Sequence, residues 1–305
     1  MKHNLKITLI LLAMFLITQI IGLAVINNYT PEYKTVVDNG IEKNVTVNQL
    51  PYGLQPPETE PAISVASILI SMAIAIFLIF ILSKIKATII LRLWFFLVVT
   101  IALAVSLNAL LPLQYSILAL VISLPLAFFK IFRQNLVVHN LTELFVYPGV
   151  AAIFVPILNI WTVMVLLVII SIYDIYAVWH SGFMQKMAKY QIHQLKIFAG
   201  FFVPDRTKKQ RQQIKLLRKS KNKKLKNKKI KVSLAILGGG DVVFPIITAG
   251  VVLRSLGIWQ ALIVSLAATL ALAILFIYSQ EGKFYPAMPF ITAGIFLGLG
   301  IAYLI

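Results

Sequence analysis

Apolar runs dominate this chain of 305 residues and constrain its fold more than any other feature. Hydrophobic residues make up 60% of the sequence, which is more than a soluble domain can bury. A membrane-spanning helix needs about 20 mostly apolar residues. The expected fold is therefore an all-α polytopic membrane protein with nine transmembrane helices. We predict these helices over residues 5–27, 62–83, 88–112, 114–131, 136–156, 159–181, 231–254, 257–279 and 284–305.

The basic residues set the predicted orientation of these helices. The net charge is +18, but 14 of the 28 lysines and arginines lie between Arg206 and Lys231, and most others flank apolar runs. This is the positive-inside distribution of membrane proteins, so we do not expect nucleic acid as a partner. With a cytoplasmic N-terminus, only Lys34, Lys43 and Arg254 lie outside. We therefore predict a protein of the cell membrane with a cytoplasmic N-terminus and an extracytoplasmic C-terminus.

Three of the ten acidic residues fall inside predicted spans: Glu143, Asp174 and Asp241. No lysine or arginine is expected deep enough in a span to pair with them. A lone charged carboxylate at mid-membrane costs at least about 2.5–3.5 kcal/mol, so each acid should be neutral, hydrated or sharing a proton. Glu143 follows His139 by four residues, and we expect these two side chains to pair along one helix face rather than to act in catalysis.

The two aspartates are expected at similar depths on consecutive antiparallel helices. Asp174 lies about 6–11 residues from the inner end of its span, or roughly 9–16 Å. If the next helix starts near Lys231, Asp241 lies roughly 15 Å along it. The three glycines before Asp241 weaken a helix and allow close approach of another segment. A single aspartate can serve as interhelical hydrogen-bonding glue, but two at one depth favour a shared chemical site.

Two neighbouring carboxylates suit aspartic-protease chemistry, because they share one proton. The ionised carboxylate activates a water, and the protonated one polarises the scissile carbonyl and then protonates the leaving amine. A helical substrate must first unwind, and β-branched residues at 229–236 predict a short strand whose edge would hold it. The other intramembrane protease chemistries lack their residues, since the sequence has neither a His-Glu-x-x-His nor a Gly-x-Ser-Gly motif. It also has no cysteine, and we expect no metal and no other cofactor.

Three short motifs lie on the sixth, seventh and ninth predicted spans. They are Tyr173-Asp174, Gly238-Gly239-Gly240-Asp241 and Pro286-Ala287-Met288-Pro289. In order and placement they resemble the Tyr-Asp, Gly-x-Gly-Asp and Pro-Ala-Leu motifs of the presenilin and signal peptide peptidase family, with methionine in place of leucine. The resemblance covers the nine-span layout, and the chain looks most like the short microbial, archaeal-like members.

This resemblance implies a presenilin-like helix bundle and an intramembrane aspartic endopeptidase with Asp174 and Asp241 as its catalytic pair. Tyr173 would pack beside the site, and the glycines would give flexibility next to Asp241. The start of the last helix would approach the pair and help to position substrate. The residues implied in these supporting roles are Tyr173, Gly238, Gly239, Gly240, Pro286, Ala287 and Met288. The substrates would be transmembrane proteins or signal-peptide remnants, cleaved in or near their membrane segments.

The same resemblance suggests a division of the chain into two parts. Residues 1–158 would hold the first five helices and an external loop over 28–61. Residues 159–305 would hold the four catalytic helices and a basic cytoplasmic loop over 183–230. Membrane lipids are expected partners, because the basic loop faces the anionic inner leaflet. No feature of the sequence indicates an obligate partner subunit.

Two other functional classes stay open on the residues alone. A proton- or ion-coupled transporter also uses midplane acids and broken helices, but it predicts an internal repeat, which we do not find. A prepilin-type Gly-x-Gly-Asp peptidase would place its second aspartate in an inner loop. The expected depth of Asp174 argues against that class.

Overall fold

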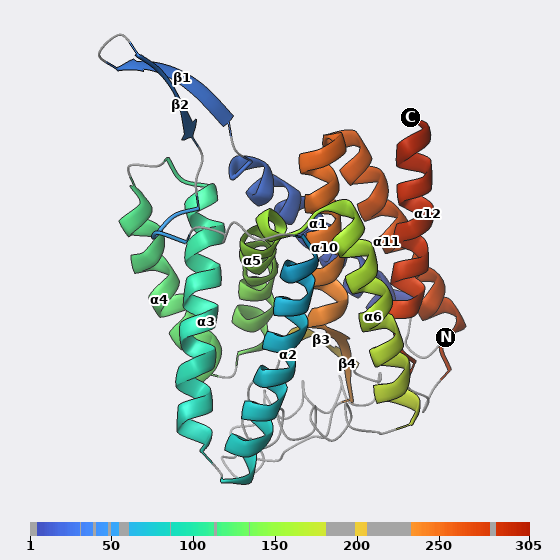
Figure 1. Ribbon diagram of the computed structural model, residues 1–305. Coiled ribbons are helices and arrows are strands. Elements are labelled where there is room, and N and C mark those ends of the chain that lie inside the picture. The colour runs from blue at the N-terminus through green and yellow to red at the C-terminus, as the bar shows by residue number, and fades with distance from the viewer. Residues whose placement is uncertain are drawn as a thin grey trace.

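Helices account for most of the chain in the computed structural model (Figure 1). The structure describes residues 5–30, 32–38, 41–47, 50–54, 61–85, 87–112, 115–133, 135–180, 199–205, 233–280 and 285–305. The helices in these ranges are α1 (Leu5–Asn28), α2 (Pro61–Lys84), α3 (Thr88–Ala109), α4 (Ser116–Phe132), α5 (Leu136–Phe154), α6 (Ile160–Trp179), α10 (Gly239–Leu256), α11 (Ile258–Tyr278) and α12 (Met288–Leu304).

Each of these helices coincides with one of the predicted spans. Six are long and apolar enough to cross a membrane: α1, α3, α5 with its 3-10 extension Val155–Ile157, α6, α10 and α11. The apolar helices α4 and α12 have 17 residues each, and α2 contains the apolar stretch Ala66–Leu82. The expectation of a polytopic helical membrane protein is confirmed, and the crossing of the membrane by all nine helices stays a prediction.

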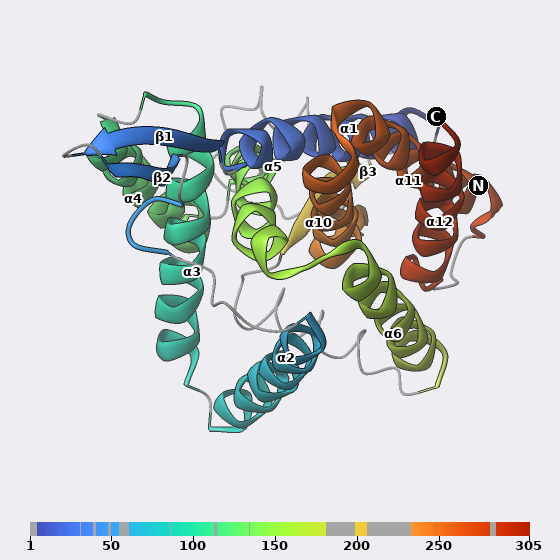
Figure 2. The same cartoon turned by 45° about the horizontal axis from the view of Figure 1, so that its top comes forward.

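Helix α10 lies at the centre of the bundle and packs against α1, α5, α6 and α11 (Figures 1 and 2). Helix α1 crosses one face of it, and the contact is close because small residues face large ones. A Cβ at Gly22 of α1 would clash with Ile246 of α10, and one at Gly250 of α10 would come 2.7 Å from Val155. The central helix is therefore held on several sides, which fixes the direction of its first turn.

Side-chain caps and one glycine explain where several helices begin. Asn135 caps α5 by accepting from the Val137 N–H at 2.9 Å. Asn159 and Thr162 form a reciprocal capping box at the start of α6, with bonds of 2.8 and 2.9 Å. Gly257 alone connects α10 to α11 with a φ of 110°, a conformation that favours glycine.

Two small antiparallel sheets lie at opposite ends of the bundle (Figure 1). Strands β1 (Glu32–Asp38) and β2 (Ile41–Val47) form a hairpin at the end where the chain finishes. This hairpin lies within residues 28–61, for which only an external loop was predicted. Strands β3 (Gly200–Asp205) and β4 (Ser233–Gly238) pair at the other end. The predicted strand over 229–236 is confirmed for Ser233 to Ile236, and residues 229–232 lie outside the described ranges.

Two predicted helix starts are wrong, and both errors lie next to the motifs. The seventh helix begins at Gly239 rather than near residue 231, because residues 233–238 pair with β3 and the glycines do not extend a helix backwards. The last helix begins at Met288 rather than 284. Pro286 disfavours helix in the residue before it, whereas Pro289 is well placed in the first turn.

Candidate active site

Asp174 lies on α6, 6% exposed, against the start of α12. Its Oδ2 accepts a hydrogen bond from the Met288 N–H at 3.1 Å. One turn away, the hydroxyls of Ser171 and Thr292 bond across the same pair of helices at 2.8 Å. A carboxylate at a helix N-terminus is stabilised by the free amides and the helix dipole. The Pro-Ala-Met segment therefore delivers a main-chain donor to Asp174.

Asp241 is the third residue of α10 and lies in its first turn, directly after β4. It is half-buried, and its Oδ2 lies 3.0 Å from the position that a Cβ on Gly238 would occupy. The carboxylates of Asp241 and Asp174 are close enough to interact electrostatically. The estimate of ten helical residues before Asp241 is wrong, because a strand replaces the expected helix turns. The two aspartates are nevertheless within electrostatic range of each other, since α6 and α10 pack together.

The other predicted site residues lie around these carboxylates. Tyr173 is half-buried and interacts electrostatically with Asp174. Pro286 and Met288 are buried, and Ala287 between them is half-buried. The glycines differ: a Cβ at Gly239 would come 2.9 Å from the Tyr147 hydroxyl, whereas one at Gly240 would meet only Phe244, at 3.8 Å.

A cavity of about 410 Å³ adjoins Asp241. Strand β4, the last turns of α11 and the segment before α12 form its walls. Its lining includes Leu234, Ile236, Leu275, Phe276, Tyr285 and Ala287, besides Asp241. An apolar cavity with one carboxylate in its wall suits an apolar peptide segment that undergoes acid–base chemistry.

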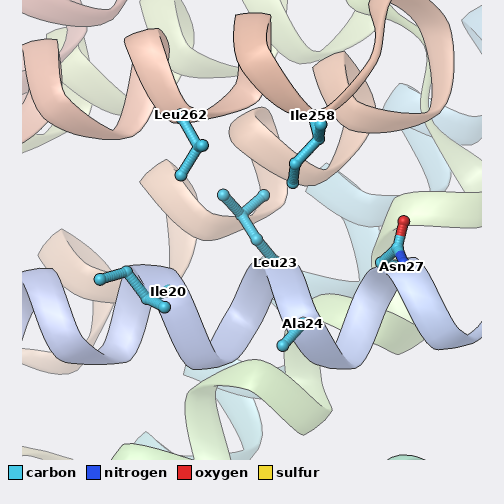
Figure 3. Close-up of a pocket in the computed structure, with 6 residues that line it drawn as sticks. All are labelled: Ile20, Leu23, Ala24, Asn27, Ile258 and Leu262. Atoms are coloured by element: carbon cyan, nitrogen blue, oxygen red, sulfur yellow. The ribbon is translucent and has the colours of Figure 1, made fainter.

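A second cavity, of about 340 Å³, lies between α1 and α11 (Figure 3). Ile258 and Leu262 of α11 face Leu23 of α1 across it. Its remaining lining residues are Ile20, Ala24 and Asn27. Because Asn27 is the one polar side chain among these six and no acid is present, this cavity is not a candidate active site.

The two edges of the β3–β4 sheet have different surroundings. Helix α5 occupies the outer edge of β3: the Asn140 amide donates to the Phe202 carbonyl at 2.8 Å and accepts from its N–H at 3.0 Å. His139 Nε2 donates to the Gly200 carbonyl at 2.8 Å. The outer edge of β4 pairs with no other strand among the described residues. Three residues of β4, Leu234, Ile236 and Leu237, line the cavity that Asp241 also lines.

Glu143 has a partner that we did not predict. Lys130 Nζ lies 2.6 Å from Glu143 Oε1, and both side chains are buried. His139 Nε2 is 3.5 Å from the same oxygen, so the predicted pairing with His139 is secondary. The expectation that no lysine reaches an intramembrane acid is wrong, because α4 packs beside α5 and Lys130 bonds across that interface.

Sequence reasoning also missed Tyr147, Ser171 and Thr292. Tyr147 is 4% exposed and follows Glu143 by four residues, a spacing that places both on one helix face. That spacing was the available signal. Ser171 and Thr292 carried no such signal, since their contact joins helices 121 residues apart in the chain.

A membrane-type helical bundle with two interacting aspartates beside an apolar cavity defines the class of intramembrane aspartyl proteases. Residues 46–305 match the family model described as "Signal-peptide peptidase, presenilin aspartyl protease". The chain therefore belongs to the signal peptide peptidase and presenilin family of aspartyl proteases. A search among curated proteins found no matching sequence.

Solved structures agree with this assignment at the level of the fold. A presenilin family intramembrane aspartate protease in space group C222 superposes with a TM-score of 0.61 and 17% identity, over 97% of this chain and 98% of that chain. The P2 form gives a TM-score of 0.59 and 17% identity, over 98% and 97%. The protein is thus a multi-pass integral membrane protein and an aspartic intramembrane endopeptidase, and the transporter and prepilin-peptidase alternatives are not favoured.

Proposed function

We propose that Asp174 and Asp241 are the catalytic pair of this intramembrane protease. One observation carries the proposal: α6 and α10 bring two carboxylates into electrostatic range, and neither forms an ion pair within the described residues. A pair without a cation shares one proton, so one member is a base while the other is an acid. This arrangement supplies both functions that amide hydrolysis requires.

The reaction follows from this division of roles. The ionised carboxylate takes a proton from a water as that water attacks the scissile carbonyl carbon. The protonated carboxyl donates a hydrogen bond to the carbonyl oxygen as it becomes a tetrahedral alkoxide or hydroxyl. Collapse of this intermediate breaks the C–N bond, and a carboxyl proton passes to the leaving amine. The Met288 N–H orients the Asp174 carboxylate throughout, since it is part of a helix start.

The free edge of β4 supports a binding mode for the substrate. A transmembrane segment that unwinds can add an extended strand to this edge through main-chain hydrogen bonds, which suit almost any sequence. Alternate side chains would then enter the apolar cavity beside Asp241. Substrates of this kind are transmembrane proteins or signal-peptide remnants.

The supporting residues follow from their positions beside the pair. Tyr173 packs next to Asp174, and Pro286, Ala287 and Met288 set the start of α12 against it. Gly238, Gly239 and Gly240 form the joint between β4 and α10. In this proposal the helices within residues 159–305 carry the two catalytic aspartates, and the helices within residues 1–158 support those helices.

The orientation proposal rests on the basic residues. The N-terminus is cytoplasmic and the C-terminus extracytoplasmic, in the cell membrane. The basic loop over 183–230, of which the structure describes only residues 199–205, then faces the inner leaflet, where it contacts anionic lipid.

A cleavage assay tests the catalytic pair. Purified protein in lipid is incubated with a single-span reporter from pH 4 to pH 9, a range chosen to cover carboxyl titration. We expect wild type to cleave with a bell-shaped pH profile, because one acid and one base are required. Asp174→Asn and Asp241→Asn should each lower the rate by at least about 10³-fold, as losses of catalytic groups do in other proteases.

The matched control is Asp38→Asn, which removes a carboxylate from β1 at the opposite end of the bundle. This variant should cleave at the wild-type rate. Cleavage at the wild-type rate by either Asp174→Asn or Asp241→Asn would refute the proposed pair.

A further inference from the structure

Two buried polar atoms near the active site lack a hydrogen-bond partner in the part of the chain that the structure describes. They are Glu143 Oε2 and the Tyr147 hydroxyl, both on α5. The residues are 1% and 4% exposed, so both atoms are shielded from bulk solvent. A separation of four residues places the two side chains on the same face of the helix, one turn apart. A phenol donates and a carboxylate oxygen accepts, so the two atoms are complementary.

The other oxygen of Glu143 is firmly held. Lys130 Nζ lies 2.6 Å from Oε1, and the Gly200 N–H donates to it at 3.4 Å. His139 Nε2 is 3.5 Å from the same oxygen, but its closer contact is the Gly200 carbonyl at 2.8 Å. Because a carbonyl only accepts, that nitrogen carries a proton. The carboxylate is therefore fixed by α4, α5 and β3, with Oε2 left to receive Tyr147.

The tyrosine ring reaches the joint between β4 and α10. A Cβ at Gly239 would lie 2.9 Å from the Tyr147 oxygen and 3.0 Å from Cε1, so a side chain here would force the tyrosine or the turn to shift. The Gly239 N–H donates to the Ala199 carbonyl at 3.1 Å, and this bond holds the Gly239 main chain against the residue that precedes β3. Phe201 packs edge-on against the tyrosine ring, with centroids 5.6 Å apart. The hydroxyl thus lies against the main chain two residues before Asp241.

Tyr147 also interacts electrostatically with the carboxylates on either side of this contact. The Tyr147 hydroxyl interacts with the charges of both Glu143 and Asp241. A hydroxyl between two carboxylates can donate to only one of them at a time. The firmly held Glu143 is the natural acceptor, and the ring is then locked in place against Gly239.

We propose that Tyr147 is a positioning residue for the protease reaction, which connects the buried Lys130–Glu143 pair to the Gly239–Asp241 turn. By donating to Glu143 it fixes the ring, and the ring fixes the main chain at Gly239, two residues before Asp241. A displacement of about 1 Å at a catalytic group costs on the order of 10²-fold in rate. The inference rests on the proposed role of Asp241 and adds a residue that orients its carboxylate.

Tyr147→Phe tests the proposal, because it removes the hydroxyl and keeps the ring that packs on Gly239 and Phe201. We expect kcat for the reporter to fall roughly 10- to 100-fold with KM unchanged, since the bound substrate does not contact this side chain. The melting temperature in detergent should fall no more than that of the control variant.

The matched control is Tyr29→Phe, a second buried tyrosine whose hydroxyl donates to the Val105 carbonyl at 2.8 Å, far from the aspartates in sequence. It should lower the melting temperature and leave kcat unchanged. An unchanged kcat in Tyr147→Phe would overturn the proposal. So would a kcat that recovers fully at a lower temperature where the variant is folded, because the role would then be structural only.

A second set of variants tests the hydrogen bond itself. Lys130→Met with Glu143→Gln keeps an acceptor for Tyr147 without leaving a lone buried charge, so kcat should stay close to that of wild type and well above that of Tyr147→Phe. Lys130→Met with Glu143→Leu removes the acceptor and should reproduce the kcat of Tyr147→Phe, with no further loss when Tyr147→Phe is added. Additive losses would overturn the proposed link. The result for Asp241→Asn separates these outcomes from a failure of the catalytic assignment, which would appear as cleavage by that variant.

Discussion

The three acids inside the helices occupy two regions with opposite electrostatics. Between α4 and α5, Glu143 is buried with a lysine 2.6 Å away. Where α6, α10 and α12 meet, Asp174 and Asp241 interact electrostatically, and no ion pair neutralises either within the described residues. A carboxylate paired with a cation keeps its charge and its position, whereas two neighbouring carboxylates without a cation can exchange a proton. The difference separates an acid that supports structure from acids that perform chemistry.

The two regions are nevertheless connected through strand β3. Asn140 and His139 of α5 bond to its outer edge, and β4 pairs with its inner edge. Strand β4 then runs directly into the glycines and Asp241. The ion-paired region therefore positions the reactive one without taking part in it.

The largest effect on stability should come from Lys130→Met. This change leaves Glu143 as a lone buried charge, which typically lowers the free energy of unfolding by about 3–5 kcal/mol. Thermal unfolding in detergent measures it. Adding Glu143→Gln should restore most of the loss, and a single variant as stable as wild type would show that the pair is not structural.

Gly239→Ala should have the next largest effect, because its methyl group would lie 2.9 Å from the Tyr147 oxygen. Overpacking of this kind destabilises by about 1–3 kcal/mol, and the shifted turn should also lower cleavage strongly. The matched control is Gly240→Ala, whose methyl meets only Phe244 at 3.8 Å. This variant should be up to about 1 kcal/mol more stable than wild type, since alanine favours helix over glycine. Equal losses in the two variants would contradict the assigned contact.

Asn140→Ala would break the connection between the regions. It removes the two hydrogen bonds between this side chain and the Phe202 main chain, which should lower stability by about 1–2 kcal/mol. Cleavage should fall as well, because β3 orders the edge to which substrate binds. Asn135→Ala, which removes only the cap of α5, should lower stability by about 1 kcal/mol and leave kcat unchanged. If the two variants cleave equally well, the α5 contact does not support the substrate edge.

Ser171→Ala should have the smallest effect. It removes one hydrogen bond, to Thr292, between α6 and α12, so we expect a loss of about 0.5–1.5 kcal/mol and a modest fall in cleavage. The double variant with Thr292→Val should be no less stable than either single one, because the two hydroxyls satisfy each other. Additive losses in thermal unfolding would show that each hydroxyl has another partner.

Hydropathy predicts the helices of this protein well, because an apolar run of about 20 residues indicates a membrane-spanning helix. The exceptions are local. Residues 233–238 are as apolar as the start of a helix, yet they form a strand. They pair with β3, and the glycines that end this segment favour helix only weakly. Pro286 likewise delays α12 to Met288. Hydropathy alone does not distinguish helix from strand at these two places. Pairing with a strand distant in sequence determines the first, and a proline determines the second.

The candidate site was predictable only in part, for a related physical reason. Asp174 and Asp241 stand out as acids in apolar runs, so sequence alone identifies them. Their neighbours do not, because the register between helices is set by packing. Lys130 looks like a loop residue at a span boundary, and its bond to Glu143 appears only when α4 packs on α5.

The most direct test of the distinction between paired and unpaired acids is the binding of a transition-state analogue. A reporter peptide whose scissile amide is replaced by a hydroxyl-bearing tetrahedral carbon would be titrated by calorimetry into four proteins. Wild type and the Lys130→Met, Glu143→Gln double variant should bind within about tenfold of each other, whereas Asp174→Asn and Asp241→Asn should each lose at least about 10²-fold in affinity. Tight binding by either aspartate variant, or its loss in the double variant, would contradict the assignment of chemistry to Asp174 and Asp241 and of support to Glu143.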